Sequence, residues 1–218
     1  VNKLVSMIDE AIHIQAIGLM PDVPIELKAT RITAGTKKFK LQSFAKFVAD
    51  QQGIVDLKIA KPTEGTYQDM DPMGLFWSLE RKEEVYEEQT TTEKLAPHKL
   101  TISLHIQNEV VDEIELIRLW NAPHIVREDV RAEGIVGTYF YNESLEKKPG
   151  VIVVGGSEGG IYEYLASLLA AHDFSVLALG YFGEEGLPKG LHHIPMEYFK
   201  LGIDWLKARA EVAEGWLG

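Results

Sequence analysis

Four glycines and one serine form the stretch whose residue types and spacing could best support chemistry. Residues 155–160 read Gly-Gly-Ser-Glu-Gly-Gly, after the apolar run Val151–Val154 and before an amphipathic segment that begins at Ile161. Glycine has no Cβ, so such a loop can adopt positive φ and bring backbone N–H groups close to a ligand, while a following helix adds the positive end of its dipole. The spacing predicts a site for negative charge.

Three known glycine motifs can be set against this loop. A dinucleotide-binding loop needs G-x-G-x-x-G and an acidic residue about twenty positions later, and Ser157 breaks that glycine spacing. A Walker loop needs Lys-Ser or Lys-Thr, which is missing here. Residues 155–159 do match G-x-S-x-G, the elbow that carries the nucleophilic serine of α/β-hydrolases.

Chain order argues against Ser157 as a nucleophile. An elbow serine is followed by an acid and then a histidine on later strand ends, and only 61 of the 218 residues follow Ser157. The acids and histidines in question are Asp173, His192, His193 and Asp204. One strand and one helix cannot bring an acid and a base round to the serine. Two interpretations remain open: the other glycine loop of that fold, whose backbone N–H completes an oxyanion hole, or a plain strand-to-helix turn.

The elements that must position this loop form a predicted β-α-β-α unit from residue 146 onward, after the polar segment 146–150. We expect strands at Val151–Val154 and Ser175–Leu179, and helices at Ile161–His172 and Met196–Ala210. A β-branched run without alternation is typical of a strand buried on both faces of a parallel sheet. Apolar spacing predicts the buried faces of the helices, which are Ile161, Leu165, Leu168 and Leu169 in the first and Phe199, Ile203, Leu206 and Ala210 in the second.

Residues 1–145 are predicted to form an antiparallel β-sandwich. Apolar and polar residues alternate in Ile12–Ala16 and Leu100–Ile106, which is the period of half-buried strands. Further strands are expected at Ile25–Ile32, Phe39–Val48, Gly74–Leu79, Glu113–Leu119, Val126–Arg131 and Gly134–Tyr141. Turn-rich segments separate them, and seven or more short strands with such spacing favour a sandwich. The large apolar residues of Met73–Leu79 are interpreted as core or domain interface.

Composition and charge narrow the classes of partner. With 22 Lys and Arg against 33 Asp and Glu, the net charge of −11 argues against a nucleic-acid partner. The chain has no cysteine, which excludes disulfides and thiolate metal sites and is compatible with a cytoplasmic protein. The histidines lack metal-binding spacing, so no metal and no cofactor are expected. No apolar run is long enough to span a membrane. The acidic segment 83–93 is interpreted as a solvated loop or edge.

The sequence resembles the acyl-CoA thioesterase and bile-acid-CoA:amino-acid N-acyltransferase family over nearly its whole length. The resemblance rests on Asp-Pro-Met-Gly-Leu-Phe-Trp-Ser-Leu at 71–79, Asn-Ala-Pro at 121–123 before Val-Arg-Glu at 126–128, the glycine segment 150–160, and the segment 178–188 with its Tyr-Phe-Gly and Gly-Leu-Pro. It implies an immunoglobulin-like sandwich over 1–145, followed over 146–218 by the first part of an α/β-hydrolase domain. Such enzymes cleave or transfer the acyl group of an acyl-CoA thioester through a nucleophile, an Asp and a His.

The same resemblance implies where the catalytic groups lie. In the family the elbow follows the helix that here is Met196–Ala210, so all three triad positions are expected beyond Gly218 and the hydrolase domain is expected to be incomplete. Gly156 and Ser157 are then candidate oxyanion donors through backbone N–H, and Tyr181 and Phe182 candidate borders of the acyl pocket.

The expected function is therefore part of an acyl-CoA hydrolase (acyl-CoA and water to fatty acid and CoA) that is inactive by itself. Transfer of the acyl group to an amino acid, a stand-alone binding module and a serine hydrolase using Ser157 are the alternatives. An incomplete sheet leaves an unpaired edge and apolar surface, which predicts self-association through residues 146–218.

Overall fold

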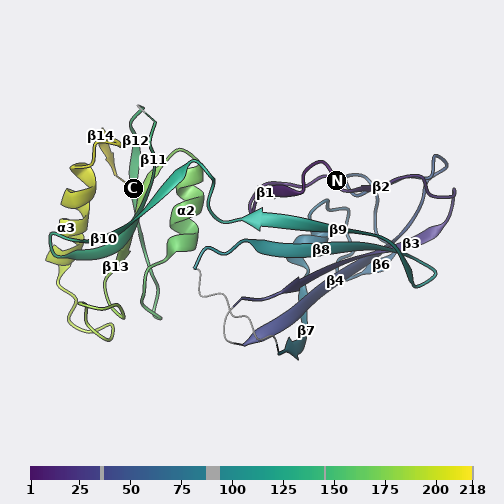
Figure 1. Ribbon diagram of the computed structural model, residues 1–218, viewed down its shortest axis with the longest axis horizontal. Helices are drawn as coiled ribbons and strands as arrows, with labels where there is room; N and C mark the ends of the chain where they lie inside the picture. The colour runs from purple at the N-terminus through teal and green to yellow at the C-terminus, as the bar shows by residue number, and fades with distance from the viewer. Residues whose placement is uncertain (35–36, 87–93, 145, 218) are drawn as a thin grey trace. The chain divides into compact units, whose positions relative to one another are not determined.

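A computed structural model of the protein describes residues 1–34, 37–86, 94–144 and 146–217 (Figure 1). Residues 87–93, which make up much of the acidic segment singled out above, therefore lie outside the description. The chain divides into two compact units, Val1–Leu119 and Trp120–Gly218. Most of the regular structure is β-strand, and the helices within the described ranges are few, so the fold is mixed and mostly β.

The first unit is built on one seven-stranded sheet with the order β1-β9-β8-β3-β4-β6, in which β7 also pairs with β4. Its strands are antiparallel apart from the parallel pair of β1 and β9. Two short strands form a separate antiparallel ribbon. The strands of the large sheet are β1 (Val5–Met7), β3 (Pro24–Ile32), β4 (Lys38–Val48), β6 (Glu64–Gly65), β7 (Glu80–Val85), β8 (His98–Ile106) and β9 (Glu109–Leu119), and those of the ribbon are β2 (Gln15–Ala16) and β5 (Val55–Asp56).

Alternation along the strands explains the core of this unit. In β3, Ile25, Leu27 and Ala29 are buried, while Glu26, Lys28 and Thr30 between and after them are half-buried. The buried side chains of the sheet pack with residues of the segments outside it, among them Ile12, Leu57 and Leu75. The predicted strands at 25–32, 39–48, 100–106 and 113–119 are confirmed, whereas only Gln15–Ala16 of the predicted strand Ile12–Ala16 is β-structure.

The prediction of a strand at Gly74–Leu79 is wrong, because the first four of these residues form the short helix α1 (Gly74–Trp77). Asp71 holds this turn with both carboxylate oxygens, accepting from the Met73 N–H at 2.7 Å and from the Trp77 indole at 2.8 Å. A run of large apolar residues cannot by itself distinguish a strand from a short helix. Leu75 is fully buried, as expected for core, but Trp77 is 62% exposed.

The second unit is a five-stranded sheet with the order β10-β11-β13-β12-β14. β12 pairs in parallel with both β13 and β14, while β11 is antiparallel to β10 and to β13. Figure 1 shows α2 and α3 on opposite sides of this sheet. The elements are β10 (Ile125–Ala132), β11 (Ile135–Asn142), β12 (Lys148–Val154), α2 (Glu163–Ala171), β13 (Ser175–Gly180), α3 (Met196–Lys207) and β14 (Val212–Leu217).

The sheet membership of β10 and β11 differs from the prediction. Both strands exist as predicted, but they pair with β13 and belong to the unit that begins at Trp120, not to a first domain ending at residue 145. The six residues Ile135–Phe140 are all buried, which suits a strand covered on both faces. Local pattern identifies such a strand, but the pairing that decides its sheet is made with residues about forty positions away.

The buried face of α2 differs from the predicted one, and in α3 only Leu206 of the four predicted residues is fully buried. In α2 the buried residues are Glu163, Ala166, Ser167 and Ala170, while Leu165 is half-exposed. In α3 they are Gly202, Trp205 and Leu206, and Ala210 lies exposed beyond the helix. Small residues let a helix approach a sheet closely: a Cβ on Gly202 would lie 2.9 Å from a methyl carbon of Leu179. In α2, therefore, small residues and not the leucines mark the buried face, whereas in α3 Trp205 and Leu206 flank a glycine at the contact.

The β-α-β-α pattern is also extended by β14, which the sequence did not predict. This strand pairs in parallel with β12, with Lys148 opposite Val212. Its sequence, Val-Ala-Glu-Gly-Trp-Leu, contains Ala, Glu and Gly, which have low β-propensity. The non-local pairing with β12 overrides that weak local preference.

Candidate functional site

The glycine loop and the segment after β13 lie together at the carboxyl ends of two neighbouring strands of the second sheet. Because β12 and β13 run parallel, the two strands end on the same side of the sheet. The N–H of Gly160 donates to the carbonyl oxygen of Phe182 at 3.0 Å. The hydroxyl of Tyr181 donates to the carbonyl oxygen of Gly155 at 2.9 Å. The structure thus brings together the two segments that hold the site residues predicted from the sequence.

The loop itself is a tight turn closed by glycines. The N–H of Gly159 donates to the carbonyl oxygen of Gly156 at 3.2 Å, which closes a four-residue turn. Gly159 and Gly160 then take φ of +69° and +80°. These angles belong to the left-handed region that side chains with a Cβ disfavour. The last two glycines therefore carry the unusual backbone of the loop.

Gly156 differs from Gly159 in its surroundings. A Cβ on Gly156 would meet nothing within 4 Å, and its φ is not positive. A Cβ on Gly159 would lie 2.8 Å from the ring and 2.9 Å from the carbonyl oxygen of Phe182. Only the second position thus requires glycine for both conformation and space. The sequence predicted positive φ in the loop but not its place.

The turn presents backbone donors to its surroundings. Gly156, Ser157 and Glu158 are exposed, and among the described residues no acceptor receives the N–H of Gly156 or of Ser157. Backbone N–H groups are strong donors that normally find a partner, from protein, water or ligand. Their position after a parallel strand is the place where ligands bind in open α/β sheets. The turn can therefore donate hydrogen bonds to an anionic oxygen.

The surroundings of the Ser157 side chain bear on whether it could be a nucleophile. Within the described ranges its hydroxyl makes no hydrogen bond with a histidine or a carboxylate. An activated serine needs a base within hydrogen-bonding reach. Among the described residues, Ser157 has no such base within reach.

Tyr181 and Phe182 both contact the loop or its support. Phe182 is only 4% exposed, and its ring packs against Gly159. The Tyr181 ring lies 4.9 Å from the Phe182 ring and 5.5 Å from the Phe199 ring, measured between centroids. In this structure Phe182 therefore supports the glycine turn from inside, and Tyr181, which is half-buried, ties the strand end to α3.

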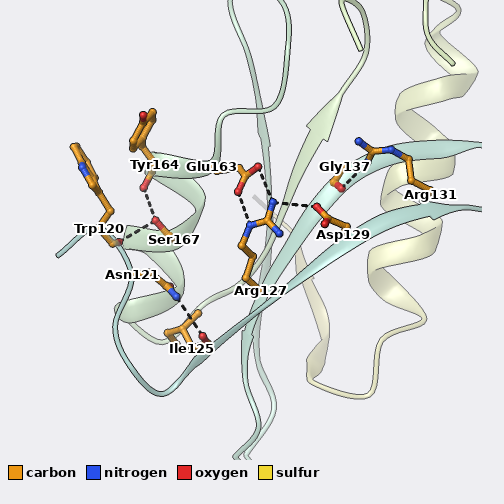
Figure 2. A network of polar contacts seen from close by, with 10 residues as sticks. All are labelled: Trp120, Asn121, Ile125, Arg127, Asp129, Arg131, Gly137, Glu163, Tyr164 and Ser167. Carbon is orange, nitrogen blue, oxygen red and sulfur yellow. Dashed lines mark hydrogen bonds and ion pairs between the residues drawn. The ribbon is translucent and has the colours of Figure 1, made fainter. Parts of the chain in front are cut away.

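An ion pair between the partly exposed Arg127 and the buried Glu163 lies at the start of the helix that follows the loop. Figure 2 shows Glu163, in the first turn of α2, facing Arg127 on β10. The Arg127 Nε donates to Glu163 Oε2 at 2.7 Å and its Nη2 to Glu163 Oε1 at 3.0 Å. Arg127 Nη2 also donates to Asp129 Oδ1 at 3.0 Å. The hydrogen bonds to Glu163 raise the pKa of Arg127 further above its usual value.

This pair corrects the expected electrostatics of the site. The positive end of α2 was expected to attract a ligand anion, but the protein's own Glu163 carboxylate, 1% exposed, already occupies the first turn. Within the described structure, this leaves the turn at 156–159 as the candidate for an anion site. Sequence reasoning missed Arg127 and Glu163 as functional candidates. The signal was the spacing of Glu163, Ala166, Ser167 and Ala170 on one helical face.

Other classes of site find little support in the described chain. No group of three or more His, Asp or Glu side chains is arranged there to hold a metal ion. None of the helices in the described ranges has the length and apolar character needed to cross a membrane. A hollow of about 250 Å³ in the first unit is lined by residues that include Glu26, Lys46 and His105. Its volume is below the roughly 300–1,000 Å³ of most ligand pockets.

Comparison with known proteins relates this chain to acyl-CoA enzymes. The family model described as "Acyl-CoA thioester hydrolase/BAAT N-terminal region" matches residues 9–132. The chain is 32% identical over 215 residues to human acyl-coenzyme A thioesterase 1, covering 94% of the chain and 49% of that protein. It is 33% identical over 218 residues to mouse bile acid-CoA:amino acid N-acyltransferase, covering 96% and 51% respectively. The chain spans about half the length of these curated relatives. It belongs to the acyl-CoA thioester hydrolase/BAAT N-terminal family.

Proposed function

We propose that this chain is part of an enzyme that cleaves acyl-CoA thioesters, and that its glycine turn supplies oxyanion donors to the reaction. The observation that carries the proposal is the exposed turn after β12, whose Gly156 and Ser157 N–H groups have no acceptor among the described residues. The names of the relatives supply the substrate class, an acyl-CoA thioester. The turn supplies the chemistry.

The proposed step is acyl transfer through a tetrahedral intermediate. A nucleophile adds to the thioester carbonyl, and its proton passes to a base. The carbonyl oxygen becomes an oxyanion, which the N–H groups of Gly156 and Ser157 stabilise. The C–S bond then breaks, and the CoA thiolate leaves with the proton. Water releases the acyl group as a fatty acid in the same two stages. Each preset donor is worth about 3 kcal/mol in the transition state.

The nucleophile, acid and base are proposed to come from residues outside these 218. Ser157 has no base partner among the described residues, and the relatives are about twice as long as the chain. In fold terms, we propose that the second unit is the first part of an α/β-hydrolase domain and the first unit an immunoglobulin-like sandwich. The parallel strands β12, β13 and β14 with helices on both sides support the former.

Transfer to an amino acid is the alternative to hydrolysis, because the relatives include both kinds of enzyme at similar identity. The two differ in the acceptor that attacks the acyl-enzyme. Assays of the full-length protein with acyl-CoA, with and without added glycine, separate the free fatty acid from the N-acyl product.

The test of this proposal begins with the chain alone. We expect no acyl-CoA hydrolysis above background and no labelling of Ser157 by a covalent serine-reactive probe. Labelling at Ser157, together with turnover that disappears in Ser157→Ala, would show a self-contained serine hydrolase. Specific binding of a ligand to the first unit, with no acyl-CoA chemistry in the full-length protein, would show a binding module.

A further inference from the structure

The first turn of α2 lacks the usual means of fixing a helix start. Its N-cap residue, Tyr162, makes no side-chain hydrogen bond to the helix. Ser, Thr, Asp and Asn normally supply such a bond to the free N–H groups of the first turn. Here the residue after the cap is Glu163, a carboxylate that is 1% exposed. The start of the helix is therefore held by whatever pairs with Glu163.

Arg127 is fixed before it reaches Glu163. Its backbone lies in the middle of β10, opposite Phe140 of β11. Asp129, two residues along and on the same face of the strand, receives Arg127 Nη2 at 3.0 Å. The guanidinium then presents two parallel donors to the Glu163 carboxylate, at 2.7 and 3.0 Å. A two-point fork fixes both distance and orientation, which a single contact does not.

The position of Glu163 is coupled to the glycine turn by a short stretch of chain. Only Ile161 and Tyr162 separate Glu163 from Gly160, whose N–H is bound to the Phe182 carbonyl oxygen. Gly159 beside it is in contact with the Phe182 ring. The turn is thus held between the end of β12 on one side and the first turn of α2 on the other. A shift of the helix start would therefore act through only two residues on the two left-handed glycines.

We propose that Arg127 is a positioning residue, which acts through Glu163 to hold the glycine turn in the conformation that presents the Gly156 and Ser157 N–H groups. The significance of this for acyl-CoA chemistry rests on the proposed function above, but the mechanical coupling does not. Arg127 itself touches no substrate in this account. The carboxylates of Glu163 and Asp129 carry two negative charges against the one positive charge of the Arg127 guanidinium. Arg127 therefore does not offer a positive site for an anion.

A purely structural ion pair would behave differently from a positioning one. Replacing both members of a buried pair by apolar side chains is often neutral or stabilising, whereas removing one member leaves an unpaired buried charge. If the pair serves only stability, the double replacement Arg127→Met with Glu163→Leu should restore the free energy of unfolding and the turn. If the pair positions the turn, the double replacement should not restore the turn conformation, because the fork that orients the helix start is absent in both variants.

The experiment is NMR of the chain as it stands, reading the backbone amides of Gly159 and Gly160 in four variants. These are Arg127→Met, the double variant, Asp129→Asn, and Ser175→Ala as a matched control. Ser175 is buried in the same sheet at the other end of β13, where its hydroxyl donates to the Glu211 carbonyl oxygen at 3.1 Å. Global unfolding is measured in parallel. No catalytic assay is needed, so failure of the proposed function leaves this test intact.

We expect the amides of Gly159 and Gly160 to shift and to exchange at least about tenfold faster in Arg127→Met and in the double variant, even where the double variant regains wild-type unfolding. Tenfold corresponds to about 1.4 kcal/mol of local opening. Asp129→Asn, whose amide oxygen can still accept from Arg127 Nη2, should leave both amides close to wild type, and so should Ser175→Ala. Wild-type amide shifts and exchange in the double variant would overturn the proposal, as would equal changes in Ser175→Ala. If Arg127→Met fails to fold, the double variant alone decides.

Discussion

The ring of Phe182 lies so close to Gly159 that a Cβ on this glycine would come within 2.8 Å of it. The φ of Gly159 is +69°, so the position combines a left-handed backbone with no room for a side chain. Gly156, three residues earlier in the same turn, has neither constraint. Gly159 therefore meets the conformational requirement of the loop, whereas Gly156 is exposed and under no such requirement.

Gly159→Ala should destabilise the second unit by about 1–3 kcal/mol, because it adds strain at positive φ to a clash with Phe182. Gly156→Ala should change the free energy of unfolding by no more than about 0.5 kcal/mol. Urea unfolding of both variants measures the difference. Equal effects would contradict the geometry of the turn.

Tyr181→Phe should loosen the contact between the loops that follow β12 and β13. It removes the 2.9 Å hydrogen bond to the Gly155 carbonyl oxygen while keeping the ring contacts. A hydrogen bond of this kind contributes about 1 kcal/mol. Thermal unfolding measures the loss, and Tyr162→Phe, on a residue that is 42% exposed, serves as the control. A Tyr181→Phe variant as stable as that control would show that the hydroxyl does not join the two loops.

Much of the fold can be predicted from the sequence, because the relevant signals are local. The alternation in β3 and β8 and the β-branched run in β12 each identify a strand, and the glycines after β12 identify the turn. Parallel pairing of β12 and β13 follows from the β-α-β pattern between them. These features required no knowledge of distant partners.

The remaining features depend on contacts between residues far apart in the sequence. β10 and β11 carry a clear strand pattern, but pairing with β13 decides which sheet they join. The contact face of α2 is made of Ala166, Ser167 and Ala170, because close approach to the sheet selects small side chains over the nearby leucines. Glu163 reads as an ordinary charged residue until Arg127, 36 positions earlier, is placed beside it.

The stability of the first unit should fall as the pH drops from about 6.5 toward 4. Burial, with the Arg31 charge adding to it, lowers the pKa of His98 from 6.5 to about 4. Between pH 6.5 and 4, His98 therefore binds more protons in the unfolded chain than in the folded one. Its contribution to the free energy of unfolding is fully present only above about pH 6.5 and is lost as the pH falls toward 4. Neutral His98 accepts from Arg31 Nη2 at 2.9 Å.

His98→Gln tests this dependence, because glutamine can still accept from Arg31 but does not titrate. The free energy of unfolding of the variant, measured from pH 7 to 4, should decline less steeply than that of the wild type. His192→Gln, on an exposed histidine, is the control. Parallel curves for wild type and His98→Gln would refute the contribution of His98.

Self-association through residues 146–218 stays a prediction. In the described chain β10 and β14 are the edges of the five-stranded sheet, and α2 exposes about half of Tyr164 and of Leu165. Strand edges and apolar surface favour pairing with a second copy. Sedimentation at several concentrations should show a mass that rises with concentration. A stable monomer whose 150–210 region is as protected from hydrogen exchange as the first unit would speak against it.

The most direct test of the central claim is kcat for acyl-CoA hydrolysis by the longer enzyme of which we propose this chain is a part, compared between Ser157→Ala and Gly159→Val. If the turn acts through its backbone, Ser157→Ala should keep kcat within a few fold of wild type. Gly159→Val, which distorts the turn, should lower kcat by about 10²–10³, the cost of losing one oxyanion donor. Loss of activity in Ser157→Ala with activity retained in Gly159→Val would contradict the account.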